Sequence, residues 1–173
     1  MSSTWRKETE TMIEESTRQE NINLVPIGRV VNDVEYPSDV RWETITSKVV
    51  IAPHLVEALD GIDGFSHVLI IFYLDKMDED RRCLLQVHPE NKGELPLVGV
   101  FATRSPARPN PIGVTVVKLL ERQENVLKVL GLDAYDGTPV LDVKPYLRRG
   151  DLIEEATMPD WLLHLWELQD SGH

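Results

Sequence analysis

Short runs of β-branched and aromatic residues, separated by Gly, Pro, Asn and Asp, limit the folds that this chain can adopt. Runs of that length between turn residues are typical of strands in all-β proteins. The longest of these runs, residues 65–74, is apolar almost without interruption, whereas a strand with one face in solvent alternates apolar and polar residues. It therefore predicts a strand that is buried on both faces. The expected strands are residues 22–31 with an interruption at Pro26, 47–52, 65–74, 83–87, 97–103, 112–120, 126–132 and 140–143. The series predicts an all-β barrel or sandwich.

Helical patterns are short and flank the strands. Residues 1–20 are polar and lack a strong apolar stripe, which predicts a frayed helix or a disordered tail. Short helices are expected over residues 53–59 and from Pro159 onward. The second of these presents an apolar face made of Trp161, Leu162, Leu165 and Trp166. We therefore expect a polar tail over residues 1–20, one barrel domain over 21–150, and an acidic segment with a short helix over 151–173.

Composition excludes several classes of function. A net charge of −11 argues against a protein that coats nucleic acid without sequence preference. The longest apolar run, residues 68–74, is too short to cross a bilayer, so no membrane association is expected. The single cysteine, Cys83, fits a reducing compartment, and a cytoplasmic location is expected. Metal-ligand spacings, G-x-G-x-x-G and the P-loop pattern are all absent from the sequence, so no metal site and no Rossmann or P-loop site is predicted.

The stretch GVFATRSPARPNPIG, residues 99–113, is both stiff and basic. Its three prolines fix φ and remove backbone donors, so it is neither a helix nor a central strand. Such a loop can present Arg104 and Arg108 in fixed positions to a carboxylate or a phosphate. The alternative is a rigid crossover between strands, with both arginines paired to surface acids.

A second stretch, GLDAYDGTPVLDVKPY at residues 131–146, combines a turn with polar groups at a strand end. Asp136 and Gly137 indicate a tight turn. Asp133 and Tyr135 come directly after an apolar strand. An acid and an aromatic ring at that place can bind a ribose diol and an adenine ring.

These two stretches resemble the TsaA-like, or TrmO, family. Two further stretches share the resemblance, IGRVV near Ile27 and LDGIDGFSHVLIIFYL at residues 59–74, so that it covers about residues 24–150. The resemblance implies an all-β fold, a single small β-barrel with short flanking helices. It also implies binding of S-adenosyl-L-methionine without a Rossmann fold, usually as a homodimer. The activity it implies is N6-methylation of a threonylcarbamoyl-modified adenosine beside the tRNA anticodon. The expected partner is therefore tRNA, bound through a local basic patch.

The resemblance also implies which residues contact the cofactor. The positions that match are Asp75, Lys76, Phe101, Arg104, Val114, Leu132, Asp133, Ala134 and Tyr135. Position 75 is commonly His in bacterial members and is Asp here. The residues Val40, Arg41 and Trp42 fall near another cofactor-binding loop of the family.

Methylation of an adenine amine needs a hydrogen-bond acceptor at the nitrogen, because its lone pair is conjugated with the ring. Asn110 and Asp136 are the catalytic candidates for this role, Asn110 by analogy with Asn-Pro elements of unrelated adenine methyltransferases. Arg104 could hold the methionine carboxylate of the cofactor, and Arg108 could meet RNA phosphates together with Arg148 and Arg149. Two alternatives stay open: a methyltransferase with a small-molecule acceptor, and a module that binds S-adenosyl-L-methionine without catalysis.

Overall fold

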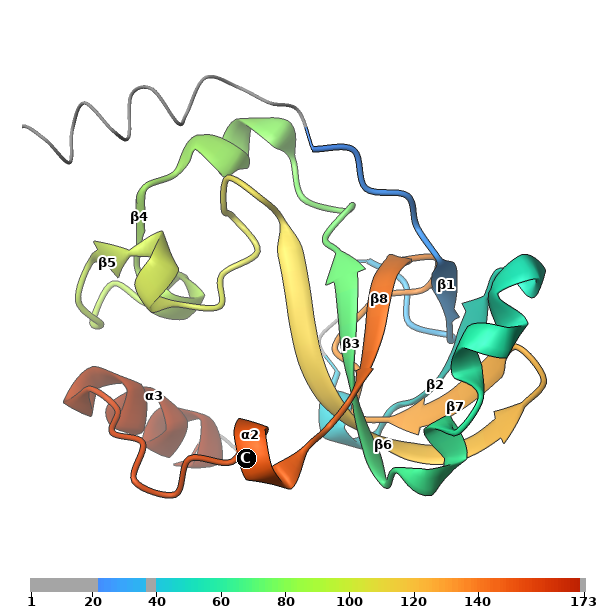
Figure 1. Cartoon of the computed structure of the whole chain (residues 1–173). Coiled ribbons are helices and arrows are strands. Elements are labelled where there is room, and N and C mark those ends of the chain that lie inside the picture. The colour runs from blue at the N-terminus through green and yellow to red at the C-terminus, as the bar shows by residue number, and fades with distance from the viewer. Residues whose placement is uncertain (1–21, 37–39, 172–173) are drawn as a thin grey trace, which may run out of the picture.

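Six antiparallel strands close into a small barrel (Figure 1). The computed structural model describes residues 22–36 and 40–171, so the expected polar tail lies outside the described residues. Neighbouring strands follow the order β1–β2–β7–β6–β3–β8 around the barrel. The prediction of an all-β barrel with short flanking helices is confirmed.

The barrel strands are β1 (Gly28–Val31), β2 (Thr46–Ile51), β3 (His67–Tyr73), β6 (Ile112–Gln123), β7 (Val126–Leu130) and β8 (Pro139–Pro145). A separate two-stranded sheet contains β4 (Gln86–Val87) and β5 (Val98–Gly99). Six 3₁₀ turns connect these strands: η1 (Trp42–Thr44), η2 (Pro53–Leu59), η3 (Ile62–Gly64), η4 (Glu79–Cys83), η5 (Pro89–Asn91) and η6 (Val100–Ala102). The helices α2 (Arg148–Asp151) and α3 (Asp160–Ser171) follow the barrel, and α3 lies beneath the small sheet in Figure 1.

Along each strand, every second side chain points inward, and these side chains fill the barrel interior. On β3, Val68, Ile70 and Phe72 are buried, whereas the residues between them are only partly covered. The prediction that both faces of residues 65–74 are buried is therefore wrong. A barrel of this size has one core, and the outer face of β3 meets no second layer of comparable extent among the described residues.

Three expected strands are much shorter in the structure. The strand expected over residues 22–31 keeps only β1, which begins after Pro26, a residue without a backbone N–H. The expected strand over residues 97–103 is reduced to β5, because the chain turns into η6, where the Thr103 hydroxyl donates to the Val100 carbonyl at 2.8 Å. The expected strand over residues 83–87 likewise keeps only β4 after η4. A hydroxyl that bonds the preceding turn competes with the strand ladder, which the apolar pattern alone does not reveal.

One end of the barrel collects most of the sequence-predicted site residues. Because all neighbouring strands are antiparallel, the ends of β1, β3 and β7 and the starts of β2, β6 and β8 lie at this end. The loop over residues 99–113 enters β6 there, and the segment over residues 131–138 connects β7 to β8 there. No helix within the described ranges is long and apolar enough to cross a membrane.

Gly113 lets the loop approach β3 closely. A Cβ at this position would lie 2.4 Å from the Phe72 ring, whereas a Cβ at Gly99 would meet nothing within 4 Å. We expect Gly113→Ala to lower the free energy of unfolding by about 1–3 kcal/mol through overpacking. Gly99→Ala, the control at the other end of the same loop, should change it by less than about 0.5 kcal/mol. Urea denaturation of both variants measures the difference, and equal stabilities would show that the Phe72 contact does not constrain the loop.

Candidate functional site

The loop over residues 99–113 is held rigid by its own hydrogen bonds as well as by its prolines. The Arg108 side chain donates from Nε to the Ser105 carbonyl at 2.7 Å and from Nη2 to the Thr103 carbonyl at 2.6 Å. The Leu74 N–H donates to the Pro111 carbonyl at 2.7 Å, which ties the loop to the end of β3. These bonds occupy Nε and Nη2 of Arg108, and the contact of this residue with RNA phosphates stays a prediction.

This loop forms a wall between two cavities. Its first half, with Phe101 and Arg104, lines a cavity of about 1000 Å³ whose far side is α3; we call this the larger cavity. Its second half, with Asn110 and Ile112, lines a cavity of about 490 Å³ that also touches Tyr73; we call this the smaller cavity. One stiff segment therefore shapes both spaces.

Arg104 is the cation that the loop leaves available. It is exposed and lines the larger cavity beside Phe101, whose side chain is 81% exposed. Within the described part of the chain, no hydrogen bond or salt bridge joins the Arg104 guanidinium to another residue. Its positive charge lowers the pKa of Asp133, although by less than the other groups around that carboxyl do.

Asp133 is the titratable group whose environment is most altered. Burial raises the pKa of its carboxyl above the ordinary 3.8, while a hydrogen bond from the Thr115 hydroxyl and the charge of Arg104 lower it. Burial is the largest of these effects, so the pKa is raised overall. The residue still keeps an exposed surface, so a ligand can reach its carboxyl. Raised carboxyl pKa values of this kind are enriched at functional sites.

The neighbours of Asp133 divide into buried supports and an aromatic cluster. Leu132 and Ala134 are only 0% and 2% exposed and belong to the core, so they can offer a ligand backbone groups but little side-chain surface. Tyr135 packs edge-to-face against Trp42 at 5.2 Å and against Tyr36 at 5.1 Å between ring centroids. The structure thus brings Trp42, expected near the cofactor, next to Tyr135.

The first half of β6 has an open edge beside Asp133. β6 spans 12 residues and β7 only 5, and the two strands pair from Lys118 onward. Before Lys118, the described strand paired with β6 is β3. Val114 lies in this part, and its side chain points outward, 45% exposed, opposite Ile71. An open strand edge presents backbone N–H and C=O groups that a flat polar ligand can bind.

The other site residues predicted from the sequence, the pair Asp75 and Lys76 together with Asp136 and Asn110, lie in separate surroundings. Asp75 pairs with Lys76 at 3.5 Å, and its Oδ1 is buried without a partner among the described residues. Asp136 accepts a hydrogen bond from the Asn32 N–H at 2.9 Å and precedes Gly137, whose φ of 78° closes a turn. Asn110 is exposed in the smaller cavity. In the described structure no contact joins Asn110 to Asp136, so the two catalytic candidates are not assembled into one constellation.

Sequence reasoning missed several residues of this region. Thr115 bonds Asp133, and Asn32 donates from Nδ2 to the Ser47 hydroxyl at 2.9 Å and to the Ala134 carbonyl at 3.0 Å. Thr115 had a detectable signal, because it is a polar residue at an inward position of an alternating strand. Asn32 had none, since its partners are far away in the sequence. No cluster of three or more His, Cys, Asp or Glu residues suited to a metal ion occurs within the described ranges.

Comparison with known proteins identifies the family. Residues 32–152 match the family model of the tRNA-methyltransferase O N-terminal domain. A "Probable S-adenosyl-L-methionine-binding protein" of Archaeoglobus fulgidus is 46% identical over 120 residues, which cover 69% of this chain and 31% of that protein. The "tRNA (adenine(37)-N6)-methyltransferase" of Escherichia coli is 40% identical over 112 residues, 62% of this chain and 47% of that enzyme.

The fold is shared with a solved member. The crystal structure of TrmO from Pseudomonas aeruginosa superposes with a TM-score of 0.67 and 27% identity, covering 83% of this chain and 62% of that one. The chain thus spans less than two thirds of each of these three proteins. The family match covers five of the six barrel strands, all but β1, together with the open edge of β6. The chain belongs to the tRNA-methyltransferase O N-terminal domain family.

Proposed function

We propose that the chain binds S-adenosyl-L-methionine and methylates N6 of a threonylcarbamoyl-modified adenosine next to the tRNA anticodon. The observation that carries the proposal is the Asp133 carboxyl, which is bonded to Thr115 at the open edge of β6 and carries a raised pKa. The names of the relatives support it, one for binding S-adenosyl-L-methionine and one for methylating a tRNA adenine.

The donor set fits the chemical groups of this cofactor. Arg104 suits the methionine carboxylate, because a guanidinium binds a carboxylate through two parallel hydrogen bonds. Asp133 can accept hydrogen bonds from the ribose hydroxyls. The open edge of β6 near Val114 offers backbone groups to the adenine. Tyr135, two residues after Asp133, adds an aromatic ring that packs edge-to-face on Trp42. When bound, the cofactor supplies the electrophilic methyl group.

The protein's own residues would orient the acceptor and accept hydrogen bonds from its amine. Asp136 already uses one carboxylate oxygen to hold the Asn32 N–H, which assigns it a role in the turn. The Asn110 side chain has no such bond among the described residues and faces the smaller cavity. Of the two catalytic candidates, Asn110 is therefore the one we propose to contact the amine. The loop's prolines and Arg108 bonds fix its position in advance.

Two further properties stay predictions. A homodimer agrees with the exposed apolar side chains on the outer face of β6, where Val114, Val116 and Leu120 are 45%, 47% and 42% exposed. A cytoplasmic location agrees with the activity proposed and with the single cysteine.

Arg104→Ala should weaken binding of S-adenosyl-L-methionine by about 10- to 100-fold, because it removes a charge-assisted bidentate pair. Isothermal titration calorimetry measures the affinity, and circular dichroism verifies that the barrel is intact. Lys128→Ala, an exposed cation on the outer face of β7, is the matched control and should bind as the wild type does. Unchanged affinity in Arg104→Ala would remove this residue from the site.

Cofactor affinity should fall on acidification, and the fall should begin at a higher pH than an ordinary aspartate would give. Asp133 binds the cofactor as the ionised carboxylate. Because burial raises its pKa, this carboxylate is protonated at a higher pH than that of an ordinary aspartate. Asp133→Asn should lower affinity about 10-fold at neutral pH and remove this acidic limb. Calorimetric titrations across the pH range measure both effects. An acidic limb that persists in the variant would assign the titration to another group.

The function is tested by methyl transfer from radiolabelled S-adenosyl-L-methionine. Label should enter tRNA that carries threonylcarbamoyladenosine and not the same tRNA without the modification. Asn110→Ala should reduce the rate of transfer about 100-fold while cofactor affinity is unchanged. Label in a metabolite pool alone would favour a small-molecule acceptor, which the net charge of −11 also suits. Cofactor binding with no labelled acceptor at all would favour a non-catalytic binding module.

A further inference from the structure

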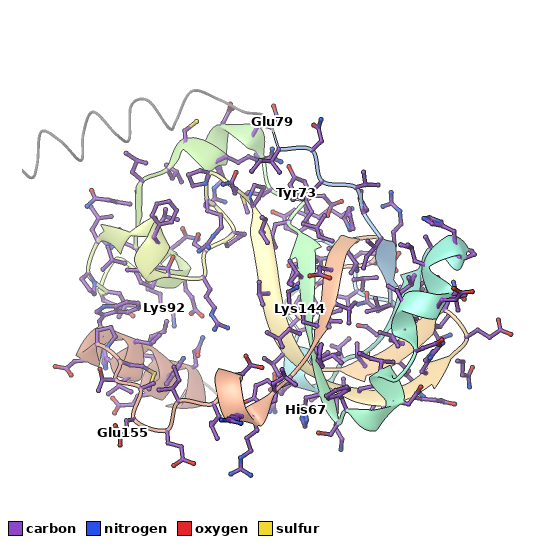
Figure 2. The ribbon with its side chains drawn as sticks, viewed as in Figure 1. His67, Tyr73, Glu79, Lys92, Lys144 and Glu155 are labelled. Carbon is purple, nitrogen blue, oxygen red and sulfur yellow. The ribbon has the colours of Figure 1, made fainter. Side chains whose placement is uncertain are left out.

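We propose that the smaller cavity is the subsite for an anionic group of the acceptor, a carboxylate or a phosphate, held by Arg82. This inference rests on the proposed function, since it assigns the second cavity of the same loop to the substrate. The cavity of about 490 Å³ lies in the range of small-molecule sites. Figure 2 shows Tyr73 and Glu79 at the end of the molecule where η4 lies near the end of β3.

Arg82 lines this cavity with much of its hydrogen-bonding capacity unused. Its Nε is buried and has no partner in the described structure. Its Nη2 lies 3.5 Å from the Met77 carbonyl, at the limit of a hydrogen bond, and its Nη1 lies 3.8 Å from Glu79. The Glu79 side chain is 90% exposed, so solvent weakens this ion pair. A half-buried guanidinium with such weak partners is stabilised by an anion that accepts two hydrogen bonds.

An aromatic ring fixes the direction of the guanidinium. The Arg82 Cζ lies 5.6 Å from the centroid of the Tyr73 ring, within the range of a cation–π contact. Tyr73 is the last residue of β3 and is paired with Ile112 at the start of β6. One of the contacts that orient the Arg82 side chain therefore comes from a barrel strand, although Arg82 itself lies in η4.

The rest of the cavity is lined by apolar side chains, several of them prolines, and by two amides, Asn23 and Asn110. Pro109, Pro111 and Pro139 all line it, so little backbone entropy is lost when a ligand enters. Asn110 lines it too, between two of these prolines, and its carbonyl accepts from the Ile112 N–H at 2.8 Å. The subsite for the anion therefore adjoins the side chain that we propose to contact the acceptor amine.

The two arginines lie on different sides of the same wall. Arg104 lines the larger cavity from the first half of the loop, whereas Arg82 faces the second half across the smaller cavity. Cofactor and acceptor each carry an anionic group, and two separate guanidinium sites keep these groups from competing. The acceptor's anion has two chemical sources, a carboxylate on a modified base and a phosphate of the RNA backbone.

Binding to Arg82 is measured by NMR through its own Nε–H resonance, with S-adenosyl-L-methionine present at saturation so that the cofactor carboxylate is already bound elsewhere. The probes are the nucleoside N6-threonylcarbamoyladenosine, adenosine 5′-monophosphate and neutral adenosine. We expect an anionic probe to shift the resonance to saturation and adenosine to leave it unchanged. Saturation by the carboxylate nucleoside identifies the modified base as the source, and saturation by the monophosphate alone identifies the backbone.

Substitutions at Arg82 and at a control position distinguish binding by Arg82 from a general effect of positive charge. Arg82→Gln should weaken binding of the anionic probe by about 10- to 100-fold with unchanged cofactor affinity. Lys128→Gln changes an exposed cation of β7 that lines neither cavity, and should alter binding less than about twofold. If Arg82→Gln does not fold, the shift of the Arg82 Nε–H resonance in the wild-type titration decides whether the anion binds at Arg82.

Two results would overturn the assignment: no shift at Arg82 with any probe, or equal affinity in the wild type and Arg82→Gln. Failure of the proposed function gives a different pattern. In that case the anionic probe still binds at Arg82, while the wild type transfers no methyl group to any tRNA.

Discussion

The contact between Phe72 and Gly113 constrains the rest of the site. Phe72 fills the barrel interior, and the loop from residue 99 can enter β6 beside it only where a side chain is missing. This contact sets the register of β6 on β3, with Thr115 facing inward and Val114 outward. Because β7 is shorter than β6, that register also determines which part of β6 keeps an open edge. Packing in the core thus decides where backbone groups are available to a ligand.

Rigidity of the loop follows from two different causes that act together. Prolines limit φ along its second half, and Arg108 bonds the carbonyls of its first half. Two nitrogens of this arginine, Nε and Nη2, are therefore used within the loop itself. Since binding energy is lost when a loop must be ordered, such internal bonding favours affinity without adding any contact.

The barrel and its family could be predicted from the sequence, because turn residues between apolar runs and two long motifs specify them locally. The roles of single residues were harder to predict. Arg108 and Arg104 belong to the same basic loop, and only the carbonyls around Arg108 distinguish them. Thr115 and Asn32 act through partners that the register brings near, and Arg82 depends on a ring from β3. Contacts of this kind depend on tertiary packing, which no local pattern encodes.

The net charge of the chain bears on how the proposed site would use its two arginines. The chain carries a net charge of −11, so its surface as a whole repels an anionic substrate. Screening limits that repulsion to about 8 Å at physiological salt, and inside a cavity nearby charges dominate. Arg104 and Arg82 each offer an underused guanidinium at such a place, on either side of one rigid loop. An acidic protein of this kind can select a substrate by the position of its anionic groups, because diffuse attraction to any polyanion is absent.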